Sequence, residues 1–170
     1  MRLFFLLYLA LVVQTTWLAD GVAWAGGARL DLPLLVVISG ALLGGWRQGA
    51  ILGLAAGWLC GVAADYNLGS FMVSRLVVGA VSGAFDRRLS DTNPLLTPLC
   101  MAGGTLLAHL IFGLMSPADF AQPWPRLLGA VVLNGLVGSA LHPVFARIAR
   151  SSSPQDAGPY VQSPRISRRN

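Results

Sequence analysis

The chain has 170 residues, of which 55% are hydrophobic and only 11% are charged. A soluble domain of this size requires much more charged surface, so the composition excludes that class and indicates that the chain lies in a lipid bilayer. The net charge of +5 does not indicate a nucleic-acid partner, because the arginines lie at the ends of apolar segments and not among aromatic residues on a polar face.

Six apolar segments follow one another along the chain. A membrane helix takes roughly 20 residues, so the length of the chain allows about six of them. The second and third are short and are separated only by residues 45–48. They could form one bent re-entrant unit, but Arg47 between them favours a tight turn at a membrane face. We therefore predict an all-helical membrane bundle over residues 1–149, with spans at about 3–19, 32–46, 48–64, 68–85, 95–115 and 126–146.

The two ends of the chain differ from the apolar segments between them. Residues 150–170 are rich in Ser, Pro, Gly and Arg and are expected to form a disordered basic tail. At the other end, Arg2, an apolar core and Ala23-Trp24-Ala25 are similar to a signal peptide with its cleavage site. The apolar core is longer than usual and Trp24 is unfavourable beside a cleavage site, so we expect the first helix to be retained.

The arginines predict the orientation of the helices. In the six-span arrangement, Arg29 and Arg126 lie on one side and Arg75 falls within the fourth span. The other side holds nine arginines, which the positive-inside rule assigns to the cytoplasm. Both ends are then cytoplasmic. The nine residues are Arg2, Arg47, Arg87, Arg88, Arg147, Arg150, Arg165, Arg168 and Arg169.

Small residues form a stripe along the third segment, where four glycines occur at intervals of four: Gly49, Gly53, Gly57 and Gly61. Such spacing lets two helix backbones approach closely within a membrane. We expect the stripe to pack inside the bundle, with an exposed stripe that docks a partner helix as the alternative.

Ionisable residues within membrane helices are costly and are therefore candidates for function. Arg75 lies in the fourth segment, and Asp65 closes the third on the same side. We predict an ion pair between them; the alternatives are that Arg75 reaches the outer headgroups or contacts a ligand. His109 and Asn134 are each expected to hydrogen-bond to another helix, and Cys60 and Cys100 to be small buried residues.

Motifs of catalysis and of metal binding are missing from the sequence. It has no G-x-S-x-G, no H-E-x-x-H and no phosphate-binding loop, and no second ligand stands three or four residues from His109. We expect no enzyme activity, no cofactor, no metal and no small-molecule substrate.

Residues 29–111 resemble the rod shape-determining protein MreD, a small bacterial inner-membrane protein. The resemblance rests on five motifs in order: Asp31-Leu32-Pro33-Leu34-Leu35, the glycine-rich stretch 49–57, Asp65 followed by Leu68-Gly69, Arg87-Arg88, and Asn93-Pro94-Leu95. Gln14-Thr15-Thr16 also looks like the polar break in the family's first helix. The chain departs from the family pattern at Tyr66-Asn67 and Ala108-His109.

The resemblance implies a non-enzymatic scaffold of the cell-elongation machinery. Its partners would be the bitopic MreC and, through it, the MreB filament and the peptidoglycan synthases. Arg87 and Arg88 would contact anionic lipid or an acidic partner surface. The alternative is the substrate-binding membrane subunit of an energy-coupling-factor vitamin transporter, which needs a cavity with convergent polar groups. The chain offers five for that purpose: Asn67, Arg75, His109, Trp124 and Asn134.

Overall fold

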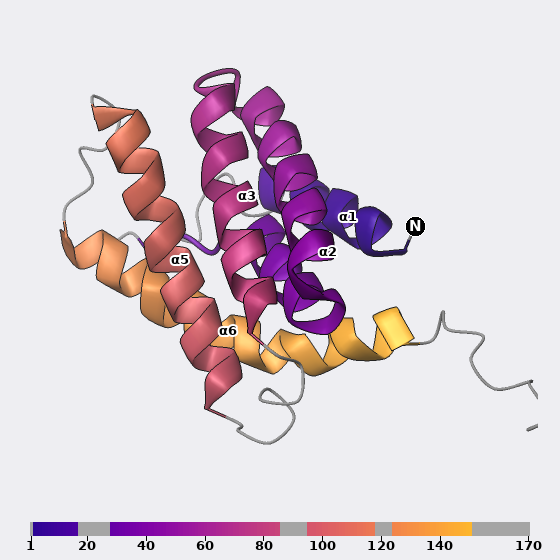
Figure 1. Cartoon of the computed structure of the whole chain (residues 1–170). Coiled ribbons are helices and arrows are strands. Elements are labelled where there is room, and N and C mark those ends of the chain that lie inside the picture. Colours follow the sequence, from indigo (N-terminus) through magenta and orange to yellow (C-terminus); the bar gives the residue numbers. More distant parts are fainter. Residues whose placement is uncertain (1, 17–27, 86–94, 118–123, 151–170) are drawn as a thin grey trace, which may run out of the picture.

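The computed structural model describes residues 2–16, 28–85, 95–117 and 124–150. Within these ranges the chain forms five α-helices (Figure 1). Three of them, α2, α5 and α6, are long and apolar enough to cross a membrane, so the protein is a helical membrane protein. The helices are α1 (Arg2–Thr16), α2 (Leu32–Ala64), α3 (Leu68–Ala84), α5 (Leu96–Met115) and α6 (Trp124–Arg150).

Helix α2 contains both the second and the third predicted segments and reverses direction between them. Gly45 interrupts it with non-helical backbone angles, φ 80° and ψ −179°. Beyond the break the two halves pack together, because a methyl group on Gly40 would meet the side chain of Leu52, and one on Gly49 would meet the Cβ of Ala41. In a continuous helix, positions 40 and 52 would lie about 18 Å apart. The chain therefore turns between the two segments, as predicted, and Gly45 is the residue at which the helix is interrupted.

Replacing Gly45 by Ala should destabilise this reversal. The backbone angles of Gly45 lie in a region open almost exclusively to glycine, where another residue costs about 1–3 kcal/mol. We expect Gly45→Ala to lower the free energy of unfolding by that amount in detergent micelles. An unchanged stability would contradict the reversed geometry.

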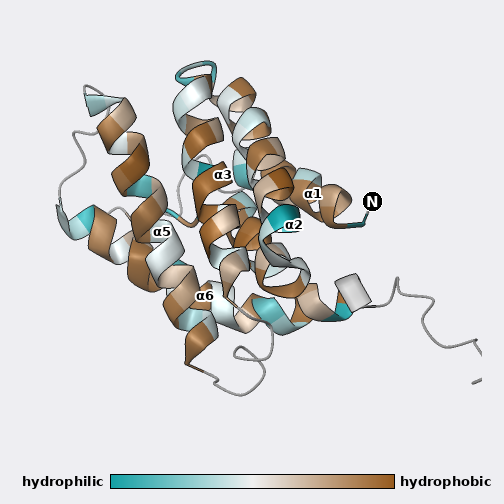
Figure 2. Ribbon diagram, in the orientation of Figure 1, coloured by the Kyte–Doolittle hydropathy of each residue, from teal (hydrophilic) through white to brown (hydrophobic). Residues whose placement is uncertain are grey.

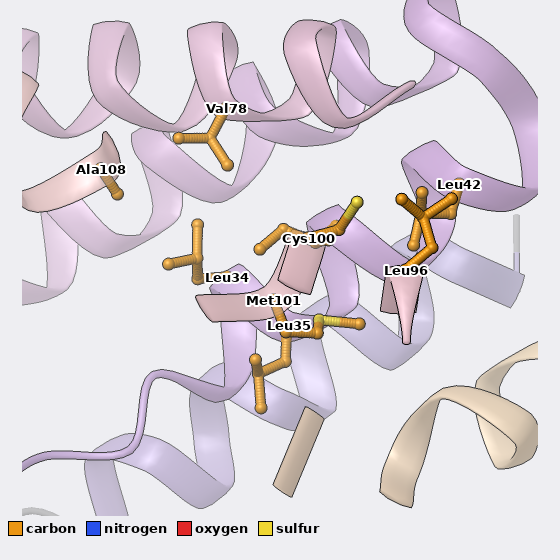
Figure 3. Packing of buried hydrophobic residues seen from close by; sticks show 9 residues of the cluster. Leu34, Leu35, Leu42, Val78, Leu96, Cys100, Met101 and Ala108 are labelled. Carbon is orange, nitrogen blue, oxygen red and sulfur yellow. The ribbon is translucent and has the colours of Figure 1, made fainter. Parts of the chain in front are cut away.

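The first half of α2 is the centre of the bundle, since residues 33–42 are all buried. One side of it packs against α3 and α5 in a single buried cluster, in which Figure 3 shows Leu35 next to Met101 and Leu42 next to Leu96. The opposite side packs against Leu7 of α1 and against Leu52 and Ala56 of the second half of α2. A helix that is apolar all round is typical of such an enclosed position.

The outer faces of the helices are also apolar. Leu114 and Leu99 on α5, Phe5 on α1 and Leu136 on α6 each expose about two thirds or more of their surface. Figure 2 shows hydrophobic positions, in brown, recurring along these helices between white and teal ones. Exposed apolar surface of this extent matches the lipid environment predicted from composition.

The observed helix bounds follow the predicted spans to within a few residues. The last helix extends beyond its predicted end at residue 146, because α6 continues through Pro143 to Arg150. Proline removes one backbone hydrogen bond, but in lipid the neighbouring backbone groups have no other partner and keep the helix intact. The predicted tail, residues 151–170, and the end of the first predicted span lie outside the described residues.

Candidate functional site

Polar side chains from three helices converge on the residue that precedes α2. We call this group the polar junction: Gln14 of α1, Asp31 before α2, Arg75 of α3 and Asn134 of α6. All four residues are buried or partly buried among apolar helices. Polar groups in such a place are costly unless they are paired with one another.

An ion pair forms the centre of the polar junction. Arg75 Nη2 lies 2.7 Å from Asp31 Oδ2, and the side chains are 8% and 24% exposed, respectively. The other carboxylate oxygen, Oδ1, accepts a hydrogen bond from the backbone N–H of Leu34 at 3.1 Å and so caps the first turn of α2. The guanidinium carbon of Arg75 also lies 5.1 Å from the ring centroid of Phe71. Asp31 therefore both neutralises Arg75 and starts the central helix.

The remaining members of the junction bind the backbone around Asp31. Gln14 Nε2 donates to the carbonyl oxygen of Leu30 at 2.6 Å, and Gln14 Oε1 accepts from the N–H of Leu32 at 3.0 Å. Asn134 Oδ1 accepts from the N–H of Asp31 at 3.0 Å. Non-helical backbone is tolerated inside a membrane bundle only where such groups are satisfied by protein. These bonds let the chain enter α2 from the interior of the bundle.

The backbone N–H groups at the start of α2 are already hydrogen-bonded within the chain and do not offer an anion-binding site. The N–H groups of Leu32 and Leu34 bond to Gln14 and Asp31, and that of Leu35 bonds to the carbonyl oxygen of Asp31. Pro33 has no N–H. The helix N-terminus is thus used entirely for the fold.

The predicted ion pair between Asp65 and Arg75 is wrong, because Arg75 pairs with Asp31, 44 residues away in sequence. Asp65 is instead the exposed C-cap of α2, with a left-handed φ of 56°. Arg75 lies about two turns along α3 from the connecting loop, roughly 10 Å from its start. The fold-back of α2 at Gly45 brings Asp31 to that depth.

The glycine stripe packs the second half of α2 against α3, as predicted. A Cβ on Gly49, Gly53 or Gly57 would meet backbone atoms of Gly79, Arg75 and Met72, and one on Gly61 would meet Leu68. All four glycines are buried. The alternative of an exposed stripe is therefore wrong, since α3 covers it. The contact at Gly53 also fixes the backbone of Arg75 beside the polar junction.

The other predicted side chains have different outcomes. Asn134 does hydrogen-bond to another segment, at Asp31. For His109, the contact found among the described residues lies within its own helix, where Nδ1 is 2.8 Å from the carbonyl oxygen of Thr105. Cys60 and Cys100 are buried and free, as expected. Arg87 and Arg88 lie outside the described residues.

Sequence reasoning did not assign a role to Gln14 or Asp31 within the site. Asp31 carried a usable signal, since an aspartate directly before Leu-Pro and an apolar run is typical of a helix N-cap. A carboxylate that caps a helix among apolar segments requires a cation to neutralise its charge. Arg75 was the candidate, because it is the arginine placed within a predicted span. Among the described residues, no three potential metal ligands come together.

Replacing Asn134 by Leu tests its part in the junction. The N–H of Asp31 would lose its acceptor, and an unsatisfied buried N–H costs about 1–3 kcal/mol. We expect a loss of that size in the free energy of unfolding, measured by thermal or denaturant unfolding in micelles. Ser139→Ala on the same helix is the matched control, because Ser139 bonds only its own helix among the described contacts. Equal losses for the two variants would contradict the role of Asn134.

The junction joins α1, α2, α3 and α6 through hydrogen bonds and one ion pair, and these contacts stabilise the packing of the four helices. Comparison with known proteins adds no relative: no family model, no curated protein and no solved structure matches the chain.

Proposed function

We propose that the protein is a non-enzymatic scaffold in the bacterial inner membrane that belongs to the cell-elongation machinery. The resemblance of residues 29–111 to the MreD family suggests this role, and the polar junction supports it. Under this proposal the chain docks a bitopic MreC-like protein and helps to organise peptidoglycan synthesis. It requires neither a cofactor nor a small-molecule substrate.

One observation favours the scaffold over a transporter subunit: three of the polar side chains considered for ligand binding each already make a hydrogen bond or an ion pair within the chain. Arg75 binds Asp31, Asn134 binds the backbone of Asp31, and His109 binds the backbone of Thr105. A vitamin-binding subunit needs such groups free and convergent on a cavity. Trp124, also considered for ligand binding, is 66% exposed at the start of α6.

We further propose that the chain crosses the membrane six times with both ends in the cytoplasm. The reversal at Gly45 supports this count, because it divides α2 into two antiparallel apolar segments. At the reversal, Trp46 is exposed and Arg47 lies over its ring, a pairing suited to a membrane interface. Figure 1 shows the turn between α2 and α3 at the opposite end of α3 from the start of α5.

The partner would bind the outer faces of the bundle and not the glycine stripe, which α3 already covers. On the cytoplasmic side, Arg87 and Arg88 would contact anionic lipid or an acidic surface of the partner. Removing both charges with Arg87→Ser and Arg88→Ser should weaken partner capture. The matched control, Arg29→Ser with Arg126→Ser, removes two charges from the opposite side and should leave capture unchanged.

Affinity capture from cells tests the function directly. The scaffold proposal predicts recovery of a bitopic coiled-coil protein and rounding of rod-shaped cells when the protein is depleted. Copurification of a vitamin, or thermal stabilisation of the purified protein by one, would overturn the scaffold in favour of the transporter subunit.

A further inference from the structure

Two hydrogen-bond donors of the polar junction have no partner among the described residues. They are Nε of Arg75 and Nδ2 of Asn134. Asn134 is 0% exposed and the Arg75 side chain 8% exposed, so neither donor is served by bulk solvent. Buried donors without an acceptor are rare in folded proteins.

The chemistry of the junction defines what such an acceptor must be. The carboxylate oxygens of Asp31 already receive Leu34 N–H and Arg75 Nη2. The Asp31–Arg75 pair is neutral as a whole, so an added anion would place an uncompensated charge among apolar helices. Both free groups are donors. The missing partner is therefore a neutral oxygen acceptor.

We propose that the polar junction binds an internal water molecule that accepts from Arg75 Nε and from Asn134 Nδ2. Both side chains bind Asp31, Arg75 through Nη2 at the carboxylate and Asn134 through Oδ1 at the N–H, so both donors belong to side chains of the same hydrogen-bonded group. A buried water typically makes about three hydrogen bonds. Its own hydrogens would be donated to an oxygen acceptor of the junction, such as the Asp31 carboxylate.

Bound water would also explain how an ion pair persists in this place. Hydration of Arg75 at Nε would lower the cost of removing its charge from bulk water. This inference does not rest on the proposed function, because it concerns groups within the bundle and holds for a scaffold and for a transporter subunit alike.

Water-edited, proton-detected solid-state NMR of the full chain in deuterated lipid tests the proposal. Side-chain Nε–H and Nδ2–H₂ signals are observed directly, and Arg75→Lys and Asn134→Leu identify them by their loss. We expect magnetisation transfer from water to both groups at short mixing times. The exposed indole N–H of Trp124 is the positive control, and the backbone N–H of Val37, a fully buried helical residue, is the negative control.

Transfer to both donors, with none to Val37, supports the bound water. Transfer to neither donor or to one alone would overturn it. Transfer from protons of a copurified organic molecule would overturn it as well, because the acceptor would then be a bound compound and not water.

Discussion

Arg75→Met is expected to lower the free energy of unfolding by about 3 kcal/mol, the loss typical of removing one partner from a buried ion pair. The variant leaves the Asp31 carboxylate without its cation inside an apolar bundle. We place the loss at the lower end of the usual range because the Asp31 side chain is 24% exposed and its charge is therefore not fully buried. Reversible unfolding in mixed micelles measures it.

Two further variants separate the ion pair from general effects of losing an arginine. Arg126→Met removes an exposed arginine and should change stability by less than about 0.5 kcal/mol. Combining Arg75→Met with Asp31→Asn removes both charges and should recover part of the loss, since no unpaired charge is then buried. A loss in Arg75→Met no larger than in Arg126→Met would show that Asp31 is not its partner.

Gly53→Ala is expected to have the second large effect, a loss of about 2–3 kcal/mol, the upper part of the range for overpacked sites. The added methyl group would meet the carbonyl oxygen and carbon of Arg75 and the Cα of Leu76. These are backbone atoms and cannot rotate away, so α2 and α3 must separate. The same unfolding measurement in micelles reports the loss.

Gly103→Ala provides the matched control in α5. No described atom beyond its immediate helical neighbours lies within 4 Å of a methyl group at this position. The substitution should therefore stabilise the protein by about 0.5–1 kcal/mol, the usual gain of Ala over Gly in a helix. Similar effects of the two substitutions would contradict close packing at the stripe.

The helices and their packing could largely be predicted from the sequence. The apolar segments predicted the helix positions, and Arg47 between two short segments predicted the turn inside α2. Four-residue spacing gave the role of Gly53 and its neighbours, because small residues at that interval permit close backbone contact whatever the partner helix is. These features depend on local sequence and on the lipid environment.

The polar junction could not be predicted, because its contacts join residues far apart in sequence. Asp65 was the nearest carboxylate along the chain to Arg75, but Asp31 reaches it through the fold-back of α2. His109 was expected to bond across helices, yet the carbonyl oxygen of Thr105 is within reach in its own helix. A side chain in lipid uses the nearest acceptor, and sequence spacing across helices does not reveal which one that is.

The reversal inside α2 predicts that Arg47 and Asp65 lie on opposite sides of the membrane. Labelling of single cysteines at these positions with a membrane-impermeant reagent tests it most directly, and the parent chain, whose Cys60 and Cys100 are buried, is the blank. We predict that Arg47→Cys reacts only from the cytoplasmic side and Asp65→Cys only from the opposite side. Reaction of both from the same side would contradict the reversal and the six-span arrangement built on it.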